Sequence, residues 1–109
     1  SKAQETLDFC KEAYDYNGDE RDIADNLALC YYYRGEYDKA KELSDKIMEG
    51  NPKFVEAYYH GAMIEKALGN YEKALEYLEK TPSCRWSAMT TVTKPEVEKL
   101  KEEVSRAAR

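Results

Sequence analysis

Apolar residues recur along this chain at the spacing of one helix face. The stripe over residues 40–48 follows the pattern i, i+3, i+4, i+7, i+8, and three other segments share that pattern in whole or in part. The stripes are Thr6, Phe9, Cys10, Ala13 and Tyr14; Ala24, Leu27, Ala28 and Tyr31; Ala40, Leu43, Ser44, Ile47 and Met48; and Val97, Leu100, Val104, Ala107 and Ala108. No segment shows the period-2 alternation of a strand, so the pattern predicts an all-α fold.

Turn-forming residues separate the stripes. Asn17-Gly18-Asp19 breaks the first helix and can start the next. Gly35 and Gly69 are predicted to lie in the turns between paired helices, where a left-handed backbone is favoured. At Asn51-Pro52 we expect one pair of helices to end and another to begin, with Asn51 as a possible cap and Pro52 near the first turn.

The last third of the chain combines an irregular stretch with a clear helix start. Pro82 should end the helix that precedes it. Residues 81–92 contain the only tryptophan, Trp86, and they are too many for a tight turn, so we expect this segment to pack on the rest of the chain or to move. Thr93 followed three residues later by Glu96 has the spacing of a capping box and predicts the start of the final helix.

A hexapeptide recurs at a fixed distance. Gly-Glu-Tyr-Asp-Lys-Ala at 35–40 returns as Gly-Asn-Tyr-Glu-Lys-Ala at 69–74, a separation of 34 residues. A period of this size is typical of helix–turn–helix repeat arrays. The register predicts a single domain over 1–109 in four parts, namely a half repeat (1–20), a full repeat (21–54), a repeat with an irregular end (55–88) and a capping helix (93–109).

On these residues the chain resembles the tetratricopeptide repeat family. The positions that match the family pattern are Ala24, Leu27, Ala28, Tyr31, Gly35, Tyr37, Ala40, Ser44, Ile47 and Pro52 in one repeat, and Tyr58, Gly61, Ala62, Glu65, Gly69, Tyr71, Ala74, Leu78, Thr81 and Trp86 in the next. Glu65 stands at a usually aromatic position and Trp86 replaces the closing proline. The resemblance covers about residues 1–80 and implies an antiparallel helix-hairpin solenoid of about six helices with a C-terminal capping helix.

Charge and composition narrow the range of partners. The chain carries 22 acidic and 17 basic residues, a net charge of −5, with both signs interspersed. This balance argues against a general affinity for nucleic acid or anionic membranes, which need clustered Lys and Arg. No apolar run is long enough to span a membrane and no signal-peptide pattern opens the sequence, so we expect a cytoplasmic or nuclear protein.

The sequence contains no recognisable catalytic or cofactor-binding motif. It has one histidine, and its glycines lack the spacing of a phosphate-binding loop. A zinc site built from Cys10, Cys30, Cys84 and His60 is conceivable, but these residues lack ligand spacing. We expect three reduced thiols that pack as small apolar side chains, with no metal and no cofactor, in a protein that is not an enzyme.

The family resemblance implies that the first helix of each repeat lines a concave groove for a peptide or a partner helix. The residues that it places there are Asp22, Asp25, Asn26, Leu29, Tyr32 and Tyr33 from the first full repeat, and Glu56, Tyr59, His60, Met63 and Lys66 from the second. Such a groove is acidic and rich in tyrosine, which suits a basic or basic–aromatic protein segment.

Each of these residue types also has a purely structural interpretation. Tyr32 and Tyr33 either contact a ligand or cover the side of a helix. Asp22 and Asp25 also favour a helix N-terminus through the macrodipole. His60 is either a solvated side chain or a pH-sensitive group, and the sequence favours the first.

One variant of the family clamps the C-terminal carboxylate of heat-shock chaperones with Lys, Asn and Arg. Asn26 matches one clamp asparagine here. However, Glu56 and His60 occupy the places of the later Lys and Arg, and Leu29 replaces another Asn. Acidic groups repel a carboxylate, so we expect no such clamp.

The sequence therefore predicts a non-catalytic scaffold for protein–protein interaction. An alternative is a structural module that forms homodimers or larger assemblies, because the Thr6, Phe9, Cys10 and Ala13 face lacks a predicted partner helix. A third hypothesis is an engineered array, which the irregular 81–92 segment disfavours. The repeats can also flank a catalytic domain of a larger protein.

Overall fold

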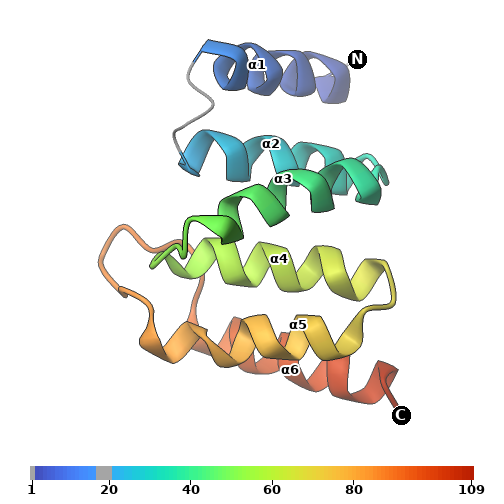
Figure 1. The fold of residues 1–109 in the computed structure, drawn as a ribbon, viewed down its shortest axis with the longest axis vertical. Coiled ribbons are helices and arrows are strands. Elements are labelled where there is room, and N and C mark those ends of the chain that lie inside the picture. The colour runs from blue at the N-terminus through green and yellow to red at the C-terminus, as the bar shows by residue number, and fades with distance from the viewer. Residues whose placement is uncertain (1, 17–20) are drawn as a thin grey trace. The chain divides into compact units, whose positions relative to one another are not determined.

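The computed structural model describes residues 2–16 and 21–109, which form helices joined by turns and loops (Figure 1). The helices are α1 (Lys2–Tyr16), α2 (Arg21–Tyr33), α3 (Tyr37–Glu49), α4 (Val55–Ala67), α5 (Tyr71–Glu79), a short 3₁₀ turn (Thr81–Ser83) and α6 (Lys94–Ala107). Within the described ranges the only β-type pairing is an isolated bridge between Phe54 and Arg85. The predicted all-α, six-helix architecture is confirmed. None of the described helices is both long and apolar enough to cross a membrane.

The chain divides into two compact units, Ser1–Asn51 and Pro52–Arg109. In the first unit α2 packs against both α1 and α3. Its core combines small and large apolar side chains, namely Leu7, Ala24, Leu27, Ala28, Ala40, Leu43 and Ile47. The alanines allow close approach of the helix backbones, and the leucines and isoleucine fill the space beside them. The stripes predicted over 24–31 and 40–48 therefore supply most of this core.

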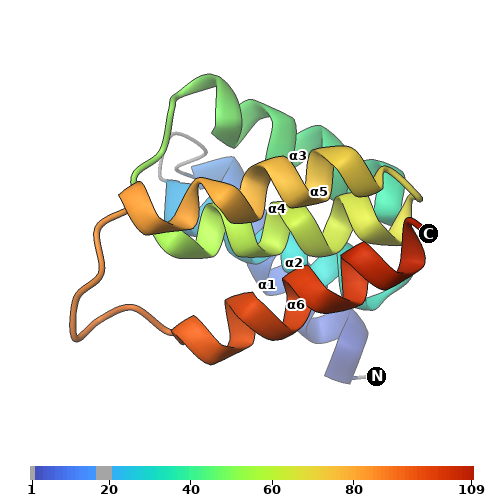
Figure 2. The same cartoon turned by 90° about the horizontal axis from the view of Figure 1, so that it is seen from below.

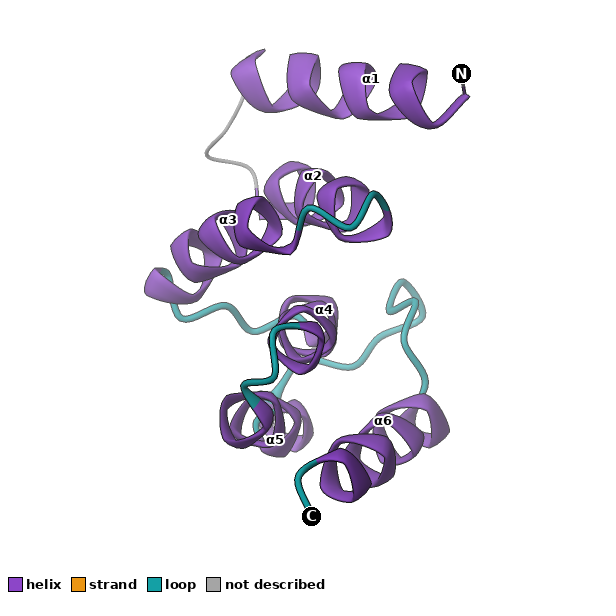
Figure 3. Ribbon diagram, turned by 90° about the vertical axis from the view of Figure 1, so that its right-hand side faces the viewer, coloured by secondary structure: helices purple, strands orange, loops and turns teal. Residues whose placement is uncertain are grey.

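The second unit is a helix hairpin with a third helix packed on it. Helices α4 and α5 form the hairpin, and α6 lies beside both (Figure 3). The side chains buried in this unit include Val55, Tyr58, Ala62, Ile64, Ala74, Tyr77, Leu78, Val97, Leu100 and Val104. Of the stripe predicted for the last helix, Ala107 and Ala108 are exposed because they lie beyond the part of α6 that is packed.

The two glycine turns repeat the same geometry. Gly35 and Gly69 have φ values of 79° and 82°. The amide of Glu36 donates to Tyr31 O at 2.9 Å, and the amide of Asn70 donates to Glu65 O at 2.8 Å. A hydrogen bond from an amide to the carbonyl five positions earlier is the signature of a helix end closed by a left-handed residue. The predicted role of both glycines is confirmed.

The prediction that Asn51 caps the next helix is wrong. Asn51 follows Gly50, the C-cap residue of α3, and has a φ of 48°, a left-handed value that asparagine tolerates. The residue at the N-cap of α4 is Phe54. Pro52 therefore precedes the helix instead of lying in its first turn, and its carbonyl accepts a hydrogen bond from Tyr58 Oη at 2.7 Å.

The predicted capping box at the final helix is confirmed. Thr93 Oγ1 accepts from the Glu96 amide at 3.3 Å, and Glu96 Oε1 accepts from the Thr93 amide at 3.0 Å. Helix α5 ends at Glu79, and Pro82 lies in the 3₁₀ turn that follows, as expected for a residue that cannot continue a helix.

The face predicted to be buried on the first helix is partly wrong. Thr6 is exposed and Phe9 retains 72% of its accessible surface, whereas Leu7 is 5% exposed. Cys10, Ala13 and Tyr14 of the predicted face are half-buried, and with Leu7 they form the more buried side of α1. The apolar pattern alone did not distinguish this side from the adjacent one. The predicted break at 17–19 lies outside the described residues.

Candidate functional site

An open cleft lies between α1 and α2 in the first unit. It has a volume of about 490 Å³ and is lined by Lys2, Ala3, Thr6 and Cys10 from α1, and by Asn26, Leu29, Cys30, Tyr33 and Arg34 from α2 and the turn after it. The helices run antiparallel, so residues early in α1 face residues late in α2. A cleft of this size has the volume typical of a small ligand site, or of a pocket for one or two side chains of a partner.

The lining of the cleft is mostly apolar with two cations at one end. Ala3, Leu29 and the ring of Tyr33 provide apolar surface, while Lys2 and Arg34 belong to the end where α1 begins and α2 finishes. Tyr33 is 74% exposed, so most of its ring is available to a partner. The cleft therefore offers an aromatic wall beside positive charge.

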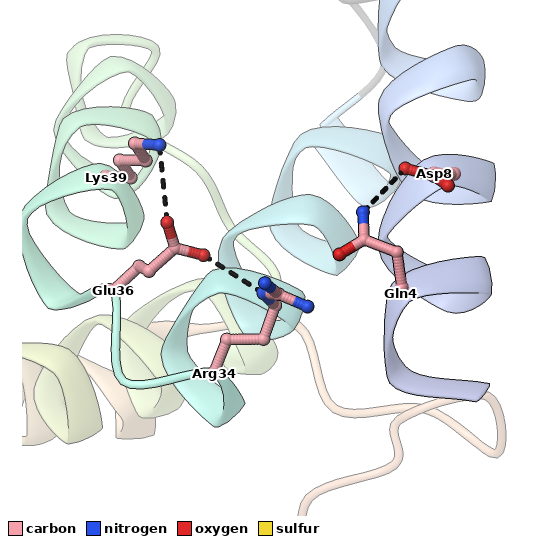
Figure 4. Close-up of polar contacts among 5 residues, drawn as sticks. All are labelled: Gln4, Asp8, Arg34, Glu36 and Lys39. Carbon is pink, nitrogen blue, oxygen red and sulfur yellow. Dashed lines mark hydrogen bonds and ion pairs between the residues drawn. The ribbon is translucent and has the colours of Figure 1, made fainter. Parts of the chain in front are cut away.

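The guanidinium of Arg34 is held in place by Glu36. Arg34 Nε lies 3.1 Å from Glu36 Oε2, and Lys39 Nζ lies 3.3 Å from Glu36 Oε1 (Figure 4). The hydrogen bond from Arg34, and then that from Lys39, lowers the pKa of Glu36 below its usual value. A second polar contact, from Gln4 Nε2 to Asp8 Oδ1 at 3.0 Å, runs along α1.

Three of the six groove residues predicted on α2 line this cleft. These are Asn26, Leu29 and Tyr33. Asp22 is exposed elsewhere on the helix, whereas Asp25 is only 6% exposed and belongs to the interior of the unit. The burial of Asp25 removes one of the carboxylates on which the expectation of an acidic surface depended.

Tyr32 belongs to an aromatic cluster. Its ring lies 5.2 Å from Tyr33 in an edge-on arrangement and 5.5 Å from Tyr37 at the start of α3. Contacts of this kind favour a fixed ring position. Tyr32 therefore supports the orientation of Tyr33, and Tyr33 is the member of the pair that borders the cleft.

The row of predicted groove residues on α4 is engaged by its own unit at both ends. Glu56 Oε2 accepts hydrogen bonds from the Thr91 amide at 2.7 Å and from Thr91 Oγ1 at 2.9 Å. At the other end, Lys66 Nζ lies 3.2 Å from Glu103 Oε2 of α6. Any ligand for this row has to compete with these contacts.

The residues between these two contacts are partly buried. Tyr59 and His60 lie with their rings 6.0 Å apart, edge to face, and Met63 is half-buried. The middle part of this row therefore has side chains that can contact a partner.

The pKa of Glu56 reflects its bond to Thr91. Partial burial of the carboxyl raises its pKa, but the Thr91 amide, the Glu56 amide and the Thr91 hydroxyl act in the opposite direction, and His60 adds a smaller effect of the same sign. The net result is a pKa below the usual value. Glu56 therefore stays ionised and keeps Thr91 bound at neutral pH.

Hydrogen bonds tie the first part of the segment over 81–92 to the second unit, whereas Met89 in the later part is 86% exposed. Trp86 Nε1 donates to Thr81 O at 2.9 Å, and the Arg85 amide donates to Lys53 O at 2.7 Å. Lys94 Nζ lies 5.4 Å from the centre of the Trp86 ring. Figure 2 shows the loop between α5 and α6 at the end of the hairpin where α4 begins. The expected packing is therefore found at Thr81, Trp86 and Val92, which are buried or half-buried, and not over residues 87–89.

The sequence-based prediction missed a pair of thiols at the cleft. Cys10 Sγ lies 3.0 Å from Cys30 Sγ, although the two residues are 20 positions apart. Burial, then the hydrogen bond and the charge of Cys10, raises the pKa of Cys30 to about 12. The available signal was the position of Cys10 and Cys30 on two consecutive antiparallel helices, which a search for short cysteine spacings does not detect.

The remaining cysteine has a different setting. Cys84 Sγ donates to Lys80 O at 3.4 Å in the second unit, and burial raises its pKa. Among the residues that the structure describes, no group of three or more His, Cys, Asp or Glu side chains is placed to hold a metal ion. The zinc site considered from the sequence has no support in the arrangement within either unit.

Helix pairs joined by glycine turns at a 34-residue period define this chain as a tetratricopeptide-like helical repeat protein. Residues 4–81, more than half of the chain, match the family model described as anaphase-promoting complex, cyclosome, subunit 3. The chain belongs to this tetratricopeptide-like repeat family, and the predicted resemblance is confirmed.

A curated relative supports the same family. Human sperm-associated antigen 1 (Homo sapiens) is 32% identical over 77 residues, which is 71% of this chain but 8% of that protein. The chain thus spans about one-twelfth of the relative that it matches. Repeat families of this kind typically serve protein–protein interaction and are typically non-catalytic.

Proposed function

We propose that this chain is a non-catalytic protein-interaction module that binds a segment of a partner protein at the cleft between α1 and α2. The observation that carries the proposal is the cleft of about 490 Å³ bordered by Tyr33, whose ring is largely exposed. Tyrosine combines large contact area with a hydroxyl and few rotatable bonds, so it is enriched in binding surfaces. Membership of a repeat family that typically binds proteins supports the same function.

We propose that the partner segment inserts a large apolar side chain and carries an acidic residue beside it. The apolar lining around Leu29 and Tyr33 suits the first feature. Lys2 and Arg34 at one end suit the second, because opposite charges across an interface fix orientation and speed association. The acidic residue is an internal side chain here, which differs from the terminal carboxylate of the chaperone clamp.

The sequence alone favoured a basic partner, and that prediction rested on three carboxylates. Asp25 is buried and Glu56 is bound to Thr91, which leaves Asp22 as the exposed member. The charges at the cleft therefore support the opposite sign of partner. A direct comparison of acidic and basic peptides distinguishes the two.

A displayed library of random peptides tests the proposal. We expect selection on the full chain to enrich peptides with an aromatic or large aliphatic residue next to Asp or Glu. Tyr33→Ala should weaken the selected peptides by about 30-fold, the effect of losing an interface hot spot of roughly 2 kcal/mol. The matched control is Tyr16→Ala, because Tyr16 is 93% exposed on α1 but does not line the cleft.

Reversing the charge of Lys2 provides a second test in the same peptide selection. Lys2→Glu should shift the selection from acidic toward neutral or basic peptides, because it places a carboxylate at the cation end of the cleft. Equal loss of binding in Tyr33→Ala and Tyr16→Ala, or selection of basic peptides by the unaltered chain, contradicts the cleft assignment.

Self-association is a second candidate function, supported by exposed rings on α1. Phe9 and Tyr16 lie outside the packed side of that helix, with 72% and 93% of their surfaces accessible. Apolar side chains that remain in water favour contacts between molecules. Light scattering over a wide concentration range tests this function, and a constant monomer mass for both the unaltered chain and Phe9→Glu removes it.

A further inference from the structure

The cleft between α1 and α2 brings together two cysteine side chains from different helices. Cys10 Sγ and Cys30 Sγ are separated by 3.0 Å, and both side chains are half-buried. A disulfide bond has a length of about 2.05 Å, so the sulfurs need to approach by about 1 Å to be joined. We propose that Cys10 and Cys30 are a modification site, a dithiol that a small-molecule disulfide oxidises to an intramolecular disulfide.

The site is open to a reagent of that size. Cys10 and Cys30 both line the 490 Å³ cleft, which gives solvent a path to their sulfur atoms. Two cationic side chains, Lys2 and Arg34, also line the cleft. Their positive charge attracts an anionic disulfide such as glutathione disulfide. Access and charge therefore favour reaction at this pair.

The two sulfurs have different parts in the reaction. Burial raises the pKa of Cys30 to about 12, and its neighbour Cys10 adds to the effect. Cys30 therefore keeps its proton at neutral pH. Because the attacking species in such an exchange is a thiolate and Cys30 is held in its thiol form, we assign the first attack to Cys10 and the resolution of the mixed disulfide to Cys30.

The reaction is a pair of thiol–disulfide exchanges. Cys10 thiolate attacks one sulfur of glutathione disulfide, forms a mixed disulfide and releases one glutathione thiolate. Cys30 then loses its proton, its sulfur attacks Cys10 Sγ, and the second glutathione thiolate leaves. The two cysteines are oxidised by two electrons in total, one glutathione disulfide is reduced to two glutathione molecules, and the two protein protons end on these products.

This inference does not depend on the proposed function. A disulfide between α1 and α2 closes a ring through residues 10 to 30 and fixes these two helices against each other. It also draws together the two sulfurs that line the cleft, so the redox state alters the surface that a partner meets. Peptide binding can fail in every assay while the oxidation still occurs, and the reverse also holds.

The test uses the full chain in glutathione buffers of graded oxidation, followed by acid quenching and mass spectrometry of proteolytic peptides. The expected product is a crosslink between the peptides that contain Cys10 and Cys30. Cys84 is the internal reference, because it lies in the second unit next to Lys80 O. We expect the crosslink at a glutathione disulfide concentration about tenfold or more below that which modifies Cys84, since intramolecular resolution favours the pair.

Two variants assign the roles. Cys30→Ala should accumulate the mixed disulfide on Cys10, whereas Cys10→Ala should leave Cys30 largely unmodified; circular dichroism confirms that each variant is folded. Cys84→Ser should leave the oxidation midpoint of the pair unchanged within about twofold. Modification of all three thiols at one midpoint, or a mixed disulfide that persists on Cys10 in the unaltered chain, overturns the proposal. So does a crosslink that includes Cys84 in place of Cys10 or Cys30.

Discussion

The Glu56–Thr91 contact should be a main anchor of the loop that joins α5 to α6. One carboxylate oxygen accepts two hydrogen bonds, at 2.7 and 2.9 Å, from residue 91. Hydrogen bonds to charged groups contribute about 1.5–3 kcal/mol when buried, and partial exposure here reduces this to about 1 kcal/mol each. Glu56 also places negative charge in the first turn of α4, which adds roughly 0.3–1 kcal/mol.

Glu56→Ala should therefore lower the free energy of unfolding of the second unit by about 2–3 kcal/mol. The assay is urea unfolding followed by the fluorescence of Trp86, the only tryptophan, which lies in that unit. Glu72→Ala is the matched control, because Glu72 is an exposed acidic residue in the first turn of α5. If both variants lose the same stability, the Thr91 bonds contribute nothing and the reasoning is refuted.

The same contact makes stability depend on pH in a defined direction. The folded-state pKa of Glu56 lies below its ordinary value of 4.5, so the contribution of its charge is complete above about pH 4.5 and is lost as the pH falls through the folded-state value. Glu56→Gln removes this titration but keeps an oxygen that accepts from Thr91. Between about pH 5 and 3, its stability should fall less steeply than that of the unaltered chain. Parallel urea curves across this range check the result.

Three further substitutions test the fold. Gly69→Ala should cost about 1–2 kcal/mol in Trp86-detected unfolding, because φ is 82° although no atom obstructs an added Cβ; an unchanged midpoint contradicts the left-handed turn. Thr93→Ala should cost about 1 kcal/mol in the same assay, with Thr93→Ser close to the unaltered chain, since the capping box needs a hydroxyl. Leu78→Ala should cost about 2–5 kcal/mol because this side chain is fully buried; a smaller loss means that the core closes around the cavity.

Features set by neighbours in the sequence could be predicted without the structure. The turn glycines follow from the 34-residue echo, and the Thr93–Glu96 box follows from a three-residue spacing. Helix number and the buried side of α3 follow from apolar periodicity. In each case the decisive interaction lies within one helix, one turn or one repeat, so local sequence determines it.

Features set by tertiary packing could not be predicted in the same way. Leu7 and Phe9 are both apolar and close in sequence, and packing on α2 decides that Leu7 is buried. Thr91 reaches Glu56 from 35 residues away, and no motif signals that bond. By its residue type and position, Asn51 is a plausible helix cap. In the structure it instead takes a left-handed conformation in the connection to α4.

The predicted groove residues on α2 and on α4 differ in how readily they can bind a ligand, because they differ in the contacts that they already make. On α4, Glu56 and Lys66 are bonded to Thr91 and Glu103 of the same unit. On α2, Leu29 and the exposed Tyr33 border an open cleft. A ligand that uses Glu56 or Lys66 on α4 must break existing polar contacts, whereas a ligand that packs on Leu29 and the exposed ring of Tyr33 displaces only solvent from them. Partner binding is therefore best sought first on α2, and substitutions at Tyr33 should affect it more than substitutions at Lys66.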